Sequence, residues 1–352
     1  MLSRHDRRYT PRLPPEPVRI DVPGDDETHV SDNESTATTL VSGEGDTDSA
    51  IDDLDRESTC TMHDDMPVVE ENGRKYLDPD KYPLPSDERE QERLDMLHEQ
   101  WLVSQNRELA LCPRETFVRV LDICTGTGVW AIDFADAHPE AHVIGVDISP
   151  IQPNYVPPNC EFQIDDVSLD WTWRQAFDFV HARMPSGCFS NLRSIFRKAF
   201  ENLKPGGHFE VKDVMLIPQS DDGTLKDDSP LLRWAGLLDE AARKMGRPIN
   251  LASQYQQMLV EAGFTDVHVI ENRWPINNWP KDHKLRMLGL WSGLTIEREL
   301  ETISMVLLTH GLHWEPERVL VLCASVRKEF LNPEVHAYFP VFTAFGMKPW
   351  SV

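Results

Sequence analysis

Residues 120–131 read Val-Leu-Asp-Ile-Cys-Thr-Gly-Thr-Gly-Val-Trp-Ala, and this stretch decides the fold. Its first part ends an apolar run that begins at Phe117 and is typical of a buried strand. Gly126 and Gly128 allow a tight turn close to a ligand, and residues 130–137 predict a helix. A strand, a glycine loop and a helix in this order open an α/β sheet that binds nucleotide-like ligands beyond the carboxyl ends of its strands.

Strands and helices alternate along the rest of the chain. Asp87, with Glu90 three residues later, forms a capping box that predicts a helix start, and the apolar residues from Leu192 to Leu203 recur with helical spacing. We expect strands at 117–122, 142–147, 161–164, 177–181, 208–211, 266–270 and 336–345, and later helices from 231 onward and at 255–262, 284–310 and 315–330. This order predicts a doubly wound, mostly parallel α/β sheet of seven strands with helical lid insertions.

The composition excludes several classes of protein. The chain carries 59 carboxylates against 35 Lys and Arg, a net charge of -24, which argues against direct binding to nucleic acid because phosphate contacts draw on clustered cations. No apolar stretch is long enough to span a membrane and no secretory signal is present, so we expect an intracellular protein, cytoplasmic or nuclear. The six cysteines lie far apart, so we expect neither disulfides nor a bound metal.

The negative charge is concentrated near the N-terminus. Between Asp21 and Glu71 there are 17 carboxylates, a single cation, Arg56, and few large apolar side chains. Such a segment cannot bury enough surface to offset its ordering entropy, so we expect residues 1–75 to form a disordered acidic tail and residues 76–352 to form the folded domain. The tail is either a solvated extension or a regulatory arm whose first arginines act in nuclear targeting.

Charge separates the two cofactors that suit the glycine loop. The pattern Gly126-x-Gly128-x-x-Ala131 fits a dinucleotide, but Asp122, Asp147 and the pair Asp165-Asp166 place carboxylates at three strand ends. A like charge about 4 Å away costs about 4 kcal/mol at an effective dielectric near 20, so Asp122, directly before the loop, would repel a pyrophosphate. It would attract a sulfonium cation, which favours S-adenosylmethionine over a nicotinamide cofactor and a methyltransferase over a dehydrogenase.

The sequence resembles a known family at this point. The stretch 120–131, the stretch Gly145-Val-Asp-Ile-Ser-Pro-Ile-Gln-Pro153 and the turn Leu203-Lys-Pro-Gly-Gly207 are similar to those of class I S-adenosylmethionine-dependent methyltransferases, most closely the fungal LaeA-like group. The resemblance covers roughly residues 82–349. It implies S-adenosylmethionine as the cofactor.

The resemblance also implies a role for particular residues in binding the donor. Asp122 and the backbone of Thr125, Gly126, Thr127 and Gly128 would face its methionine part. Asp147, followed by Ile148, would bind the ribose hydroxyls. Asp166, with the backbone of Val167, would hold the adenine edge, and the choice between Asp165 and Asp166 stays open. Cys124 departs from the family pattern, which has glycine there.

The fourth strand end offers the candidates for catalysis. A hydroxyl acceptor needs a base with a pKa near neutrality, and His181 stands where an acceptor would approach, although a structural histidine is the other interpretation. Arg183 could bind an acidic acceptor or pair with Asp178. The sequence His181-Ala-Arg-Met-Pro185 lacks the Asn/Asp-Pro-Pro-Tyr arrangement of enzymes that methylate nucleobase amines.

Two functions follow from this reading. The first is methylation of a small-molecule acceptor in fungal secondary metabolism, with the large apolar residues of the late helices as either core or an apolar lid. These residues are Trp234, Met245, Met258, Trp274, Trp279, Met287 and Trp291. The alternative is a LaeA-like nuclear regulator of secondary metabolism that acts through protein partners. Neither function involves a membrane.

Overall fold

The computed structural model describes residues 68–350, apart from the side chains of residues 297–299. Most of the predicted acidic tail lies outside the described residues. The first described element is a hairpin of β1 (Val69–Glu71) and β2 (Arg74–Tyr76), which the sequence analysis does not predict. Asn72 and Gly73 turn between the strands with φ of 50° and 72°, as a tight hairpin turn requires.

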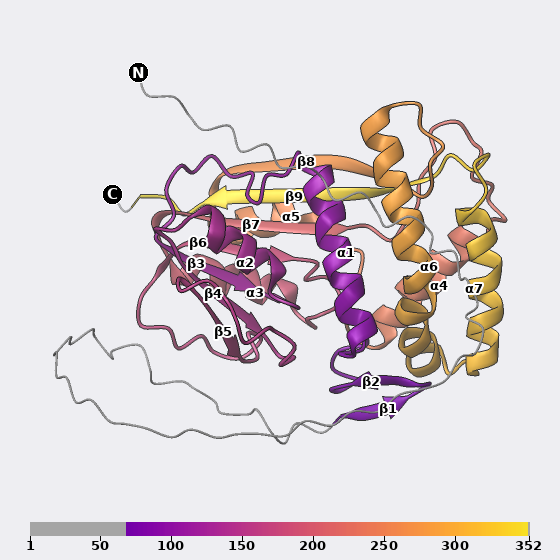
Figure 1. Ribbon diagram of the computed structural model, residues 1–352, viewed down its shortest axis with the longest axis horizontal. Coiled ribbons are helices and arrows are strands. Elements are labelled where there is room, and N and C mark those ends of the chain that lie inside the picture. Colours follow the sequence, from indigo (N-terminus) through magenta and orange to yellow (C-terminus); the bar gives the residue numbers. More distant parts are fainter. Residues whose placement is uncertain (1–67, 351–352) are drawn as a thin grey trace, which may run out of the picture. The chain divides into compact units, whose positions relative to one another are not determined.

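A seven-stranded sheet forms the centre of the domain and confirms the predicted fold class (Figure 1). Its order is β5-β4-β3-β6-β7-β9-β8, with β5 to β7 parallel and β9 antiparallel to both neighbours. The strands are β3 (Arg119–Ile123), β4 (His142–Asp147), β5 (Cys160–Ile164), β6 (Phe177–Arg183), β7 (Leu203–Val214), β8 (Thr265–Pro275) and β9 (Tyr338–Met347).

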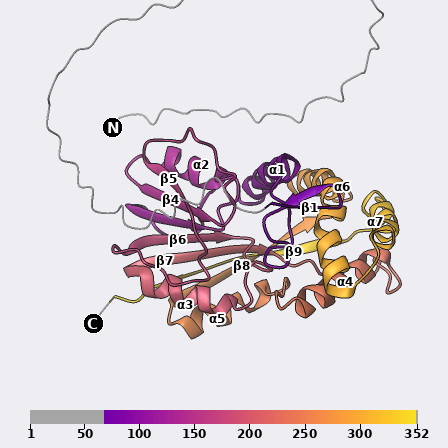
Figure 2. The same cartoon turned by 90° about the horizontal axis from the view of Figure 1, so that it is seen from below.

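Helices cover both faces of the sheet, and a second set stands beyond its carboxyl edge. The helices are α1 (Glu88–Ser104), α2 (Val129–Ala137), α3 (Leu192–Asn202), α4 (Pro230–Lys244), α5 (Tyr255–Ala262), α6 (His283–Leu312) and α7 (Pro316–Phe330), with a short 3₁₀ turn η1 (Ala252–Gln254). Figure 2 shows α2 on one face and α3 and α5 on the other. Helices α1, α4, α6 and α7 pack on one another at the carboxyl ends of the parallel strands.

A capping residue sets the start of α1, which forms part of the wall of the site described below. The side chain of Asp87 accepts the N–H of Glu90 at 3.1 Å, so the predicted cap starts α1. Two core clusters then fix the arrangement: apolar residues of α3, α5 and the central strands pack below the sheet, and those of α4, α6 and α7 pack together beside it. No helix in residues 68–350 combines the length and the apolar composition that crossing a membrane requires.

The hairpin is tied to α6 by His310. Its Nδ1 lies 2.9 Å from a carboxylate oxygen of Asp80, and its Nε2 lies 3.0 Å from one of Glu71. Arg74 of β2 adds a second link, because it donates to Asp87 at 2.7 Å and to Thr302 of α6 at 2.7 Å. The chain that leads into α1 is therefore anchored to α6, the helix that packs against α1.

We expect this anchor to weaken as pH rises. Burial lowers the pKa of His310, but the bonds to Asp80 and Glu71 outweigh burial and raise it. The charged histidine thus stabilises the anchor below the unfolded pKa of about 6.5, and this contribution is lost as pH rises through the raised folded value. Hydrogen exchange of the amides of residues 69–76, corrected for intrinsic rates, should show a few-fold lower protection at pH 8 than at pH 6. In His310→Gln this difference should vanish; an unchanged pH dependence there would contradict the assignment.

Candidate functional site

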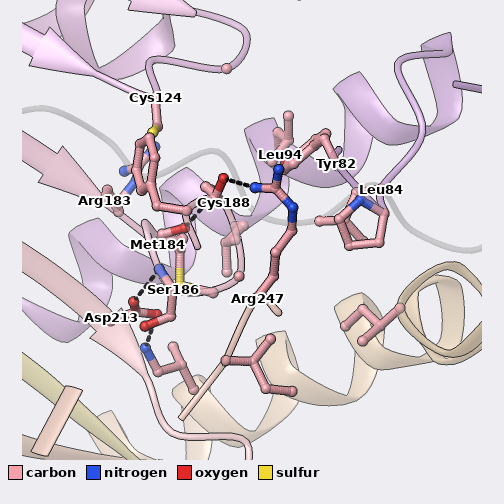
Figure 3. A pocket seen from close by; sticks show the side chains of 18 of the residues that line it. Tyr82, Leu84, Leu94, Cys124, Arg183, Met184, Ser186, Cys188, Asp213 and Arg247 are labelled. Carbon is pink, nitrogen blue, oxygen red and sulfur yellow. Dashed lines mark hydrogen bonds between the residues drawn. The ribbon is translucent and has the colours of Figure 1, made fainter. Parts of the chain in front are cut away.

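A cavity of about 250 Å³ lies at the carboxyl ends of the central strands. The loops after β3, β4, β5 and β6 and the end of β7 form one wall, and α1 and α6 form the other. Figure 3 shows Cys124, Arg183, Cys188 and Asp213 on the strand side, with Leu84 and Leu94 opposite. The site therefore lies where an open α/β sheet places its ligand.

The structure brings most of the predicted donor residues to this cavity. Those that line it are Gly126, Asp147, Ile148, Asp165, Asp166 and Val167. Arg183 lines it as well. Five predicted residues do not reach it: Asp122, Thr125, Thr127, Gly128 and His181.

Asp147 is held firmly at the end of β4. One carboxylate oxygen accepts the N–H of Gly126 at 2.8 Å and the other accepts the N–H of Ser149 at 2.9 Å. Burial raises the pKa of Asp147 against the effect of these bonds. The amide of Gln152 donates to the carbonyls of Gly126 at 2.6 Å and Ser149 at 2.8 Å, so the Ser-Pro-Ile-Gln segment braces the glycine loop. Each Asp147 oxygen keeps acceptor capacity for a hydroxyl in the cavity.

Asp166 and Asp165 differ in their surroundings. Asp166 forms an ion pair with Lys81 and accepts the N–H of Ser168 at 2.9 Å, whereas Asp165 is exposed. Burial acts to raise the pKa of Asp166, but the bonds from Lys81 and Ser168 outweigh it and lower the pKa. Lys81 and Tyr82 precede α1 and cover this end of the cavity, a contribution that sequence reasoning misses.

The positions of Asp122 and His181 differ from the sequence-based expectation that Asp122 faces the donor and His181 faces the acceptor. Side chains that are paired in register on neighbouring strands share a face of the sheet, and Asp122 is paired with His181 and His181 with Glu210. That face is covered by α2, so Asp122 is 2% exposed and His181 0% exposed. Neither faces the cavity, and His181 does not lie where it could act on an acceptor.

The contacts of His181 explain its burial. Its ring stacks on Trp130 with the centroids 3.7 Å apart, and its Nδ1 lies 2.7 Å from a carboxylate oxygen of Asp122. Burial holds the pKa of His181 well below its usual value and raises that of Asp122 to about 7. The imidazole of this pair is therefore neutral, and the carboxylate of Asp122 is buried beneath α2 and not presented to the cavity.

The remaining loop residues hold the shape of the turn. Thr125 donates its hydroxyl to Asp122 at 2.6 Å, and Thr127 donates to Asp95 of α1 at 2.7 Å. Gly128 has φ of 79° and lies against Phe162, where an added Cβ would stand 2.2 Å from the ring. These residues fix the path of the backbone around Gly126 rather than forming the cavity wall.

Cys124 replaces the family's glycine in a backbone conformation that glycine prefers. Its φ is 57°, in the left-handed region that costs an L-residue roughly 1–2 kcal/mol. The thiol lines the cavity. The neighbouring thiol of Cys188, together with burial, holds the pKa of Cys124 well above its ordinary value, so the side chain is a neutral part of the wall.

Arg183 is held by a histidine and not by Asp178. Its guanidinium donates to Nδ1 of His98 at 2.9 Å, and Nε2 of His98 lies 2.9 Å from Asp133. Burial lowers the pKa of Arg183 to about 10. Asp178 instead accepts the N–H of Arg119 at 2.9 Å and pairs with Lys204. The guanidinium of Arg183 therefore stays at the cavity wall.

The part of the cavity away from Asp147 is largely apolar. Its apolar lining includes Leu97, Trp274, Ile296, Leu307, Phe330 and Phe339. Of the late residues weighed as core or lid, Trp274 lines the cavity, whereas Trp234 and Met258 are buried in the core clusters. The polar exceptions there include Ser186, Asp213 and Arg247, which carry no local sequence signal.

The part of the cavity around Asp147 and Asp166, which we call the donor half, has the chemical groups to bind a nucleoside. The carboxylates of Asp147 and Asp166 can accept from hydroxyls and an amino group, and Ile148 and Val167 supply apolar contact for a purine. Within residues 68–350, no group of three or more His, Cys, Asp and Glu side chains is arranged to hold a metal ion.

Comparison with known proteins finds one matching family model and several similar sequences. Residues 89–269 match a family model described as a methyltransferase domain. Methyltransferase pytC of Aspergillus terreus is 36% identical over 303 residues, which cover 84% of this chain and 94% of that protein. The probable methyltransferase tdiE of Emericella nidulans is 34% identical over 300 residues, covering 82% and 94%. The secondary metabolism regulator laeA of Aspergillus fumigatus is 36% identical over 288 residues, covering 80% and 77%.

Proposed function

The chain belongs to the class I S-adenosylmethionine-dependent methyltransferases, in the fungal LaeA-like group of secondary metabolism, and on this premise we propose that it methylates a small, largely apolar organic acceptor. S-adenosylmethionine is the cofactor, and when bound it supplies a methyl group activated by the sulfonium. The protein contributes position, and alignment of two reactants is worth about 7–11 kcal/mol of a barrier.

The donor half of the cavity takes the cofactor in this proposal. Asp147 accepts from the ribose hydroxyls while it keeps its bonds to the loop. Asp166, with the backbone of Val167, holds the adenine edge, and its low pKa keeps it an acceptor at neutral pH. The backbone of Cys124 and Gly126, which Asp122 and Thr125 brace from beneath, lies along the methionine part.

One observation supports the proposal that the acceptor is largely apolar. The same cavity extends from Asp147 to Trp274 and Phe339. A molecule in that apolar part would lie beyond the methionine end of the donor site, between α1, α6 and the end of β7. Burial of apolar surface contributes roughly 25 cal/mol per Å². This apolar part of the cavity, which we call the acceptor chamber, therefore favours an acceptor with an extended apolar body. No base is required for an acceptor that is already a nucleophile.

The proposal predicts that filling the chamber stops methyl transfer without affecting the donor. Ile303 of α6 lines the cavity and is half-buried, so Ile303→Trp should place an indole in the chamber. We expect affinity for S-adenosylhomocysteine, measured by calorimetry, to change by less than about twofold, and transfer of a trideuteromethyl group from labelled S-adenosylmethionine into an extract of a strain that lacks the gene to fall at least about tenfold.

Leu294→Trp is the matched control, because Leu294 lies on the same helix, is 46% exposed and does not line the cavity. This variant should retain full transfer. Equal transfer by both variants would show that the acceptor binds elsewhere.

The regulatory alternative rests on the relatives named as secondary metabolism regulators, which match at the same 36% identity as pytC. In that role the domain would act through protein partners in the nucleus, with the N-terminal segment as an arm. It differs from the enzyme in what it requires: a scaffold keeps its effect when the donor site is disabled.

A further inference from the structure

Asp213 is a buried carboxylate on the wall of the acceptor chamber. It lies at the carboxyl end of β7 and is 1% exposed, yet it lines the cavity. It accepts the hydroxyl of Tyr255 at 2.5 Å, the N–H of Ser186 at 3.0 Å and the N–H of Val214 at 2.8 Å. Within the described residues no lysine, arginine or histidine forms an ion pair with it. Figure 3 shows its bond to Ser186 at the bottom of the cavity.

Ser186 connects this carboxylate to the cavity. Its backbone N–H donates to Asp213, its hydroxyl lies 3.0 Å from the hydroxyl of Tyr255, and Ser186 itself lines the cavity, whereas Tyr255 is fully buried behind it. A hydroxyl group of an acceptor can therefore meet Ser186 and Asp213 together. Tyr255 serves as a fixed donor that orients the carboxylate.

The proton affinity of Asp213 suits a base. Burial raises its pKa, and the bonds from Tyr255 and Ser186 only partly oppose that effect. Burial and the neighbouring Asp213 hold the pKa of Tyr255 well above its usual value, so the phenol stays neutral. The other titratable groups around the pair are the thiol of Cys188, on the loop after β6, and Arg247, which precedes η1 and donates to the carbonyl of Cys188.

Other groups in the site are already committed. Asp147, Asp165 and Asp166 line the donor half, and His181 is covered by α2. His98 accepts from Arg183 and does not line the cavity. Among the described cavity-lining residues, Asp213 is thus the carboxylate that faces the acceptor half.

We propose that the acceptor is methylated on a hydroxyl oxygen and that Asp213, with Ser186, takes the proton of that hydroxyl. The inference rests on the function proposed above and names the acceptor atom. The O–H bond breaks, its electron pair forms the new O–CH₃ bond, the pair of the C–S bond passes to sulfur, and the proton ends on the carboxylate of Asp213. The positive sulfonium and the negative carboxylate are neutralised in one step, so no isolated charge is left in the apolar chamber. A neutral amine attacks without first losing a proton and does not require such a base.

The test uses the full chain, trideuteromethyl-labelled S-adenosylmethionine and the small-molecule extract of a strain that lacks the gene. Mass spectrometry and NMR of the labelled product should place the methyl group on oxygen. Asp213→Asn should lower the transfer rate at least about 100-fold, a typical contribution of general base catalysis, and leave S-adenosylhomocysteine affinity within about twofold. The wild-type rate should rise with pH through the pKa of Asp213. This rise in the pH–rate profile should be absent in Asp213→Asn.

Two further variants separate catalysis from folding. Tyr255→Phe keeps the carboxylate of Asp213 but removes a hydrogen bond that stabilises its charged form. The pKa of Asp213 should therefore rise, and the increase in rate should move to higher pH. Asp178→Asn alters a buried carboxylate outside the cavity, 2% exposed, and should keep the rate and its pH profile. Labelling on nitrogen or carbon, or a wild-type pH profile in both Asp213→Asn and Tyr255→Phe, would overturn the inference and leave the proposed function standing. If wild-type protein labels nothing in the extract, the proposed function fails and the inference with it.

Discussion

Replacing Asp147 with alanine is expected to weaken the binding of S-adenosylhomocysteine by about 100-fold or more. A hydrogen bond to a charged group contributes about 1.5–3 kcal/mol, so losing two ribose contacts removes about 3–6 kcal/mol, and each 1.4 kcal/mol is a factor of ten. The substitution also leaves the N–H of Gly126 and the N–H of Ser149 without their acceptor, which loosens the loop along the methionine part. Isothermal titration calorimetry measures the loss directly.

Glu161→Ala provides the matched control for this variant. Glu161 lies on the neighbouring strand β5, is exposed and does not line the cavity, so its removal takes away a carboxylate of similar charge without touching the donor site. Its affinity for S-adenosylhomocysteine should stay within about twofold of wild type. A loss below tenfold in Asp147→Ala would show that the ribose is held elsewhere.

The same variant separates the enzyme from the regulatory alternative. A strain that carries Asp147→Ala in place of the wild-type gene should show the metabolite profile of the deletion strain if methyl transfer is the function. If the wild-type profile persists while calorimetry confirms that donor binding is lost, the domain acts as a scaffold.

The parts of the fold with strong local signals were predictable from the sequence. Strand β4 has the predicted bounds, residues 142–147, because an apolar run between a Pro-containing turn and a carboxylate leaves little choice. The cap at Asp87 is equally local, and so is the end of the predicted helix 255–262, where Gly263 follows with φ of 105°. The hairpin at residues 69–76 was missed because its strands are only three residues long, although its Asn72-Gly73 pair is a recognised turn signal.

Which strand-end residue reaches the cavity was not predictable. Asp122 pairs in register with Gly145, so Asp122 and Asp147 share a face of the sheet, yet Asp147 lies two residues further along and opens to the cavity, whereas Asp122 lies beneath α2 with His181. The strand register and the position of the covering helix decide this difference, and both are tertiary properties. The same reason hid Asp213, whose partners come from the loop after β6 and from α5.

The acceptor chamber shows a different limit. Leu97, Trp274 and Phe339 come from α1, β8 and β9, and only the packing of α1 and α6 brings them to one cavity. In the sequence, a residue that lines such a chamber and a residue of the core have the same apolar spacing. Trp274 and Trp234 illustrate this, since one lines the cavity and the other is buried in the core cluster beside it.

A second large effect is expected at the buried ion pair of β7. Nζ of Lys212 lies 3.0 Å from a carboxylate oxygen of Glu210, and the two side chains are 2% and 0% exposed. Lys212 also donates to the side chain of Gln105 and to the carbonyl of Leu109, both at 2.7 Å. The other oxygen of Glu210 accepts two backbone N–H groups of residues 111 and 112 at 2.7 Å. The pair thus ties β7 to the segment that joins α1 to β3.

Lys212→Met should lower the free energy of unfolding by about 3–5 kcal/mol, because it leaves the carboxylate of Glu210 buried without a cation. At about 2–4 °C per kcal/mol for a chain of this size, the melting temperature should fall by roughly 6–20 °C. Urea denaturation measures the first quantity and calorimetry the second. The double variant Glu210→Gln/Lys212→Met removes both charges and keeps an oxygen for the two N–H groups, so it should recover most of the loss. If Lys212→Met costs less than about 1 kcal/mol, or if the double variant is no better, then the buried charge of Glu210 is not what Lys212 offsets, and the segment from Gln105 to Cys112 is held to β7 by its packing alone.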